Sequence, residues 1–161
     1  MTGRVDRAER VVAAKPNEVF AAWTDAAALA EWLPPQGATM TIEQFAPKPG
    51  GALVFVLHFG AGEDHGKTDA RSDRVVGRFL ELDPPTHLAI AVAFDSDDPR
   101  YSGTMRMDWT FRPDDGGTRV SVAASDVPPG IAPEDHREGL RSSLANLARY
   151  IERTRPIMVD P

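Results

Sequence analysis

The clearest pattern along the chain is a regular alternation of apolar and polar residues between positions 103 and 112. The apolar positions are Met105, Met107, Trp109 and Phe111, and the polar positions between them include Arg106 and Asp108. Because successive side chains of a strand point to opposite faces of a sheet, this segment predicts a strand with one buried and one solvated face. Turn-forming residues 113–117 and a second alternating segment at 118–124 extend the prediction to a hairpin.

Similar segments recur before this hairpin, separated by turns rich in proline, glycine and aspartate. Further strands are predicted at residues 4–14, 37–45, 51–59, 75–82 and 88–94. With the hairpin, this makes about seven strands. Their short connections indicate an antiparallel meander rather than alternating strands and helices.

Two short helices are predicted between the first two strands. Pro16 can occupy the first turn of a helix, and Val19, Phe20 and Trp23 then fall on one face. A second segment, residues 26–32, follows Thr24 or Asp25 as its N-cap and ends at two consecutive prolines. The two helices therefore come directly after the first strand.

A long helix is predicted near the end of the sequence. It starts around Pro133 with acidic residues in its first turn, and its apolar stripe consists of Leu140, Leu144, Leu147 and Ile151. The opposite face is polar, so this helix of about 20 residues is expected to cover the apolar face of the sheet. Residues 153–161 are expected to form a tail.

This order of elements is similar to that of a known superfamily. The chain resembles the START-like superfamily, also called SRPBCC, and within it the AHSA-type branch, named after the activator of the heat-shock-protein-ninety ATPase. The resemblance spans residues 4–152, and the segments that carry it are 13–20, 23–25, 32–35, 82–88 and 139–147. It implies one domain of the α+β class with a helix-grip (START-like, Bet v-type) fold. In this fold a curved antiparallel sheet of about seven strands wraps around a long C-terminal helix, with two short helices after the first strand.

The resemblance also implies an interior cavity for a small apolar molecule between the sheet and the last helix. The residues expected to line it are Trp32, Phe55, Leu57, Met105, Met107, Trp109, Leu140 and Leu144. The alternative is that these side chains simply fill a core, although two inward methionines favour an adaptable surface. The family pattern often has tryptophan where this chain has Leu140, so no particular ligand is carried over.

Polar candidates for the cavity are few. His58 interrupts the apolar run 53–57 and is considered as a polar handle, although alternation puts it on the face of Val54 and Val56. His87 is assigned to a turn and His136 to the first turn of the last helix, and neither is expected to form a site. The loop at 60–73 is expected to be mobile and to flank the mouth of the cavity.

Three classes of function are compatible with these features. The first is binding or sequestration of a small hydrophobic or aromatic molecule. The second is an enzyme similar to polyketide cyclases or aromatases that uses the same cavity, and the third is a module that binds a protein partner. The chaperone role that names the family resembles a property of eukaryotic members with an additional N-terminal domain, and we expect none here.

Composition excludes several other classes. The chain has 18 basic and 24 acidic residues, a net charge of −6, and no cysteine. The negative charge disfavours nucleic acid, and the lack of cysteine removes thiolate metal sites and cysteine nucleophiles. No pair of histidines has ligand spacing, so no metal or cofactor is expected. Without an apolar leader or a run of about 18 apolar residues, we expect a cytoplasmic protein without membrane contact, as a monomer or homodimer.

Overall fold

Seven strands and three α-helices make up the computed structural model, which describes residues 4–59 and 72–154. The strands are β1 (Val5–Val12), β2 (Ala38–Phe45), β3 (Ala52–Phe59), β4 (Ser72–Asp83), β5 (His87–Phe94), β6 (Met105–Asp114) and β7 (Gly117–Ser125). The helices are α1 (Pro16–Trp23), α2 (Ala26–Trp32) and α3 (Pro133–Thr154), and a short 3-10 turn, η1, spans Pro99–Tyr101. The expected order of elements is confirmed.

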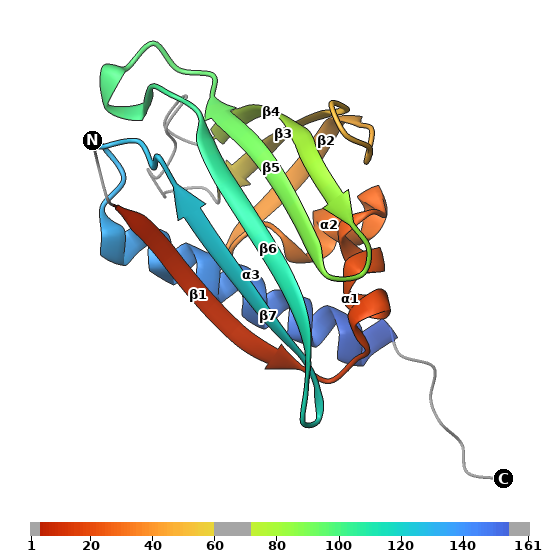
Figure 1. Ribbon diagram of the computed structural model, residues 1–161. Helices are drawn as coiled ribbons and strands as arrows, with labels where there is room; N and C mark the ends of the chain where they lie inside the picture. The colour runs from red at the N-terminus through yellow and green to blue at the C-terminus, as the bar shows by residue number, and fades with distance from the viewer. Residues whose placement is uncertain (1–3, 60–71, 155–161) are drawn as a thin grey trace, which may run out of the picture.

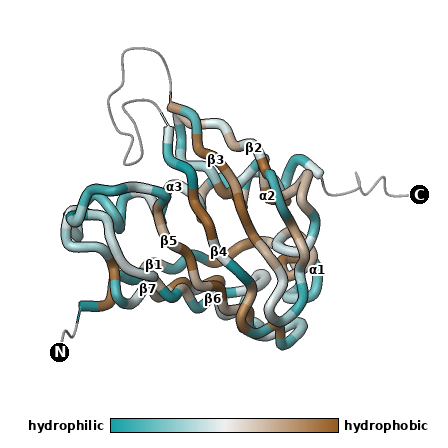
Figure 2. Tube along the Cα trace, turned by 90° about the horizontal axis from the view of Figure 1, so that it is seen from above, coloured by the Kyte–Doolittle hydropathy of each residue, from teal (hydrophilic) through white to brown (hydrophobic). Residues whose placement is uncertain are grey.

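The strands form one antiparallel sheet in the order β1-β7-β6-β5-β4-β3-β2. α3 runs along one face of this sheet behind β1 and β7, and α1 and α2 close one end (Figure 1). Hydrophobic residues gather along β3 and its neighbouring strands, between more polar turns (Figure 2). This is the helix-grip fold that the sequence predicted. Within the described residues, no helix combines the length and the apolar character that crossing a bilayer requires.

The short helices begin where the local chemistry favours a helix start. Glu18 accepts a hydrogen bond from the backbone N–H of Lys15 at 2.9 Å, just before Pro16 opens α1. Asp25, rather than Thr24, caps α2, because its carboxylate accepts from the backbone N–H groups of Ala27 and Ala28. α3 extends to Thr154, two residues into the predicted tail.

The alternation along β6 is confirmed by the burial of its side chains. Met105, Met107, Trp109 and Phe111 are buried in one core with the apolar stripe of α3. Arg106 and Asp108 lie on the outer face, with side chains 40% and 30% exposed. The inner face of the sheet, which packs against α3, is therefore the surface that a ligand between sheet and helix would contact.

Candidate functional site

One end of the inner face is tightly packed by three tryptophans. The rings of Trp23, Trp32 and Trp109 contact one another edge to face, with centroids 5.4 to 5.6 Å apart, and all three are fully buried. Phe79 joins them at 6.4 Å from Trp23. We call these four residues the closed end. Since their side chains are 0% exposed, they border no space large enough for a water molecule.

The tryptophan cluster also has two unusual polar atoms. Trp32 Nε1 donates to the backbone oxygen of Ala22 at 3.0 Å, whereas the buried Nε1 atoms of Trp23 and Trp109 have no hydrogen-bond partner among the described residues. Interplanar angles of 67° to 81° are typical of contacts in which a ring edge, including an indole N–H, faces a neighbouring ring.

Toward the other end of the inner face, the side chains keep small exposed areas. Phe55 is 6%, Met105 5%, Met107 9% and Leu140 5% exposed, and Leu57 is half-buried. We call these five residues the open end. All five were predicted to line the cavity, whereas Trp32, Trp109 and Leu144 of the same prediction lie in the fully packed part.

A buried carboxylate on the inner face was missed from the sequence. Asp73 is 0% exposed and pairs with Leu57 across β3 and β4. Val75, two residues along β4, is also buried, whereas Val76 points to the opposite, outer face and is exposed. Asp73 therefore lies on the inner face beside the open end. The composition of residues 60–73 predicts a loop, so the sequence does not show that the strand alternation extends back from Val75 to Asp73.

His58, by contrast, does not enter the interior. Its side chain is exposed, and its Nε2 lies 3.1 Å from Thr41 Oγ1 on the neighbouring strand β2. Strand alternation explains this placement, because Phe55 and Leu57 take the inner face and His58 takes the outer one. The expectation of a polar handle at His58 is thus wrong. The predicted loop at 60–73 falls outside the described residues up to position 71.

The first turn of α3 is anchored to β1 near the open end. Asp6, 2% exposed, contacts His136 Nδ1 through Oδ2 at 2.7 Å and accepts from Arg4 Nη2 at 2.9 Å. Arg4 also donates to the backbone oxygen of Ile131 at 2.7 Å. Burial alone would raise the pKa of Asp6, but the hydrogen bonds from Arg4 and His136 outweigh it, so that the pKa is lowered. The carboxylate thus stays ionised and fixes the start of α3.

The pairing of β1 with β7 and of β7 with β6 places this anchor beside the open end. Asp6 pairs with Ala124 of β7, and Ala124 pairs with Met107 of β6. The first turn of α3 is therefore held beside the strand row that contains Met107. A movement of this turn would change the space around the open end.

Two hollows on the described surface lie elsewhere. One, of about 200 Å³, is lined by residues of α1, α2 and the end of α3, among them Ala22, Ala28 and Tyr150. The other, of about 390 Å³, lies between the start of α1 and the β6–β7 turn. Neither touches a residue expected to line the cavity, so the cavity itself stays a prediction.

Comparisons with known proteins identify the family. A family model described as "Activator of Hsp90 ATPase homolog 1-like protein" matches residues 13–152. The chain belongs to this AHSA1 family. Among curated proteins, none matches the sequence significantly.

Solved structures share the AHSA1 fold over nearly the whole chain. A crystal structure of a protein from Chromobacterium violaceum is 29% identical, covers 94% of this chain and 99% of its own, and has a TM-score of 0.83. The AHSA1 protein of Silicibacter pomeroyi is 22% identical, with coverages of 94% and 100% and a TM-score of 0.76. A protein from Rhodobacter sphaeroides is 24% identical, with coverages of 93% and 94% and a TM-score of 0.74.

Two segments that carry the AHSA1 resemblance contact each other in the structure. Ser143 Oγ donates to the backbone oxygen of Leu33 at 2.6 Å, and Asn146 Nδ2 donates to that of Pro34 at 2.8 Å. Ser142 Oγ in turn accepts from the backbone N–H of Gln36 at 2.8 Å. These polar residues of α3 thus provide hydrogen-bond partners for the backbone groups of the segment that follows α2. They fix the helix at the closed end.

Proposed function

We propose that this AHSA1-family chain binds a small hydrophobic or aromatic molecule between the sheet and α3, at the open end. The observation that carries the proposal is the difference in packing along the inner face. Trp32 and Trp109 are 0% exposed at the closed end, whereas Met107 is 9% exposed and Leu57 half-buried toward the other. An apolar molecule could extend the core beside these incompletely covered side chains without unfolding it.

The side chains of the open end suit such a ligand. Methionine is flexible and polarizable, so Met105 and Met107 can adapt to different apolar shapes. A ligand that loses about 400 Å² of apolar surface gains about 10 kcal/mol, and association costs at least about 4 kcal/mol. The remaining 6 kcal/mol or so corresponds to a dissociation constant of tens of micromolar. One hydrogen bond to a polar group would tighten it.

Asp73 supports a second candidate, an enzyme similar to polyketide cyclases or aromatases. General acid–base catalysis needs a positioned group that exchanges a proton with the substrate, and carboxylates are common in this role. Asp73 is a carboxylate on the inner face next to Leu57, fully shielded from solvent. In this reading the open end orients the substrate and Asp73 handles the proton. Binding without turnover remains the first proposal, because it requires only the apolar residues.

A protein-partner module receives less support. Large hydrophobic side chains exposed on the described residues are Val5, Val11 and Val76, with exposed fractions between 37% and 40%. Val5 and Val11 lie on β1 and Val76 on β4, so they form no common patch. Isolated apolar side chains of this kind are ordinary on a protein surface.

Binding can be tested with N-phenyl-1-naphthylamine, a neutral probe that becomes fluorescent in apolar surroundings. The wild-type chain is expected to bind it with a dissociation constant of about tens of micromolar. Met107→Trp fills the open end from β6, and Leu140→Trp fills it from α3 with the residue that often occupies this position in the family. Each is expected to weaken binding at least tenfold.

Val76→Trp is the matched control, since it adds the same side chain to the exposed outer face of β4. Its dissociation constant should stay within about twofold of wild type, and circular dichroism should show that all variants are folded. If the wild-type chain binds no probe below about 1 mM, or if both filling variants bind as tightly as wild type, the proposal is wrong.

A further inference from the structure

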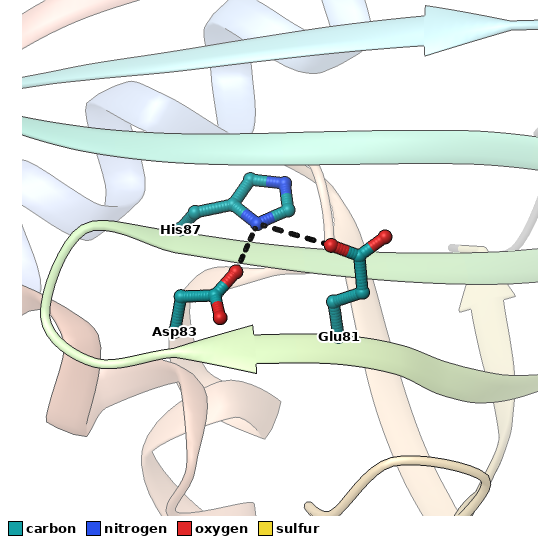
Figure 3. A group of neighbouring side chains, drawn as sticks. All are labelled: Glu81, Asp83 and His87. Atoms are coloured by element: carbon teal, nitrogen blue, oxygen red, sulfur yellow. Dashed lines mark hydrogen bonds and ion pairs between the residues drawn. The ribbon is translucent and has the colours of Figure 1, made fainter.

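A cluster of titratable side chains lies on the outer face of the sheet, away from α3. His87, the first residue of β5, is surrounded by three carboxylates. Its Nδ1 lies 3.0 Å from Asp83 Oδ2 and 4.0 Å from Glu81 Oε1, and its Nε2 lies 2.8 Å from Asp108 Oδ1. Figure 3 shows Glu81 and Asp83 directed toward the same ring nitrogen.

A β-bulge in β4 brings these carboxylates to the outer face. Phe79 pairs with Ile90, but Glu81 pairs with Ala89, so two steps along β4 match one step along β5. If the same sequence paired regularly, without a bulge, Glu81 would share the inner face with Phe79. With it, Glu81 and Asp83 lie on the same face as His87. The bulge is thus what assembles the cluster.

The turn between β4 and β5 holds Asp83 close to His87. The backbone N–H of Thr86 donates to the backbone oxygen of Asp83 at 2.7 Å, and Thr86 Oγ1 donates to the same atom at 3.1 Å. Only three residues separate Asp83 from His87, and two of them are prolines. The two side chains therefore start from fixed backbone positions.

The cluster carries more negative than positive charge. Arg106 binds both oxygens of Asp108 and donates to Glu81 Oε2 at 3.0 Å, which leaves Glu81 Oε1 facing His87. Three carboxylates and one guanidinium give a net charge of −2 when His87 is neutral. The site thus attracts a positive charge, either a proton or a metal ion.

We propose that Glu81, Asp83 and His87 bind a divalent transition-metal ion such as Zn²⁺. Their ligand atoms all lie within 4.8 Å of one another. Tetrahedral Zn²⁺ with bonds of about 2.0–2.2 Å needs ligand atoms about 3.3–3.6 Å apart. Glu81 and Asp83 have side chains that are 51% and 61% exposed, so small rotations of these two side chains would close this gap. Solvent fills the fourth position.

Asp108 provides the outer contact that a metal-binding histidine needs. Histidines that bind a metal through one ring nitrogen usually donate the other N–H to a carboxylate, which fixes the ring and increases its basicity. The contact of His87 Nε2 with Asp108 Oδ1 has this form and leaves Nδ1 for the metal. Arg106 holds Asp108 in place on the other side. The metal ion then takes the place of the Nδ1 proton, and binding should weaken as the pH falls.

Calorimetric titration of the metal-free full chain with Zn²⁺ tests the site. The wild-type chain is expected to bind one ion with a micromolar dissociation constant at pH 7.5, and more weakly at pH 6. His87→Gln and Asp83→Asn should each weaken binding at least tenfold. Asp108→Asn keeps all three ligands and should weaken it by about 10- to 100-fold. Co²⁺ should give a visible absorption band that is lost in His87→Gln.

His58→Gln is the matched control, because His58 is also an outer-face strand histidine, with Thr41 as its partner. Its Zn²⁺ affinity should equal that of wild type. If wild type fails to bind Zn²⁺ below about 1 mM, or if His87→Gln binds as wild type does, the cluster is an ion-pair network only and the proposal is overturned. Since the cluster lies opposite the open end, naphthylamine binding should be unchanged in every metal-site variant.

Discussion

Ser143 of α3 donates a hydrogen bond of 2.6 Å to the backbone oxygen of Leu33, at the end of α2. The bond joins two segments that are 110 residues apart and fixes the helix over the closed end. The exposed fraction of Ser143 is only 6%, so water cannot easily replace the hydroxyl. The strength of this contact can be measured.

Ser143→Ala should lower the free energy of unfolding by about 1–3 kcal/mol, because the carbonyl of Leu33 would lose its partner in a shielded place. Urea unfolding followed by circular dichroism measures the change. Ser121→Ala is the control, since Ser121 Oγ makes only a long 3.3 Å contact with Glu9 on the outer face. Its effect should stay below about 0.5 kcal/mol. Equal effects of the two substitutions would show that the hydrogen bond from Ser143 to Leu33 does not stabilise the fold.

The anchor at Asp6 should make stability depend on pH. The pKa of Asp6 is lowered in the folded chain, so the folded state binds this proton less readily than the unfolded state. The contribution of the carboxylate to stability is therefore complete above the unfolded pKa of about 3.9 and is lost as the pH falls through the lower folded pKa.

Asp6→Asn should consequently cost about 1–3 kcal/mol at pH 6, and the difference from wild type should shrink as the pH falls below about 4. Unfolding curves between pH 3 and pH 7 measure it. A difference that stays constant down to pH 3 would show that the charge of Asp6 is not what stabilises the start of α3.

Trp109 should report a ligand at the open end. It follows Met107 on the inner face of β6, so a molecule beside Met107 changes the surroundings of the tryptophan cluster. Because Trp23 and Trp32 contact Trp109, all three contribute to the signal. Trp109→Phe should remove at least half of the emission change on probe binding, whereas Trp23→Phe should retain most of it. An unchanged response in Trp109→Phe would move the ligand away from β6.

Asp73 should select among ligands by charge. A buried carboxylate favours a molecule with a cationic group over a neutral molecule of the same shape. Asp73→Asn should therefore weaken binding of 1-naphthylmethylamine at least fivefold and change that of 1-methylnaphthalene less than twofold. Competition with N-phenyl-1-naphthylamine measures both. If the two ligands lose affinity equally, Asp73 supports the fold of the site rather than ligand recognition.

Local periodicity explains why most of the fold could be predicted. The alternation of Met105, Met107 and Trp109 with polar residues depends only on neighbouring positions, and so does the spacing of Leu140 and Leu144 on α3. Each of these patterns is sufficient to define a strand or a helix and its buried face. The order of the elements then leaves few ways to form a single sheet.

The polar sites could not be predicted in the same way. Asp73 follows a segment rich in glycine and polar residues, which hides the start of β4. The sequence predicts a turn at His87, because it does not show that strand pairing between β4 and β5 begins immediately after Thr86. Contacts such as that of His87 with Asp108, 21 positions later, depend on strand register, which a single sequence does not encode locally.

The extra residue in β4 also affects how related sequences should be aligned. A relative of the same length whose β4 pairs regularly, without the bulge, would have the positions of Glu81 and Asp83 turned toward its interior, although the surrounding letters align without difficulty. Columns at this point can therefore equate an interior position of one protein with a solvent-facing position of another. Substitution patterns after Phe79 are comparable only among relatives that share the bulge.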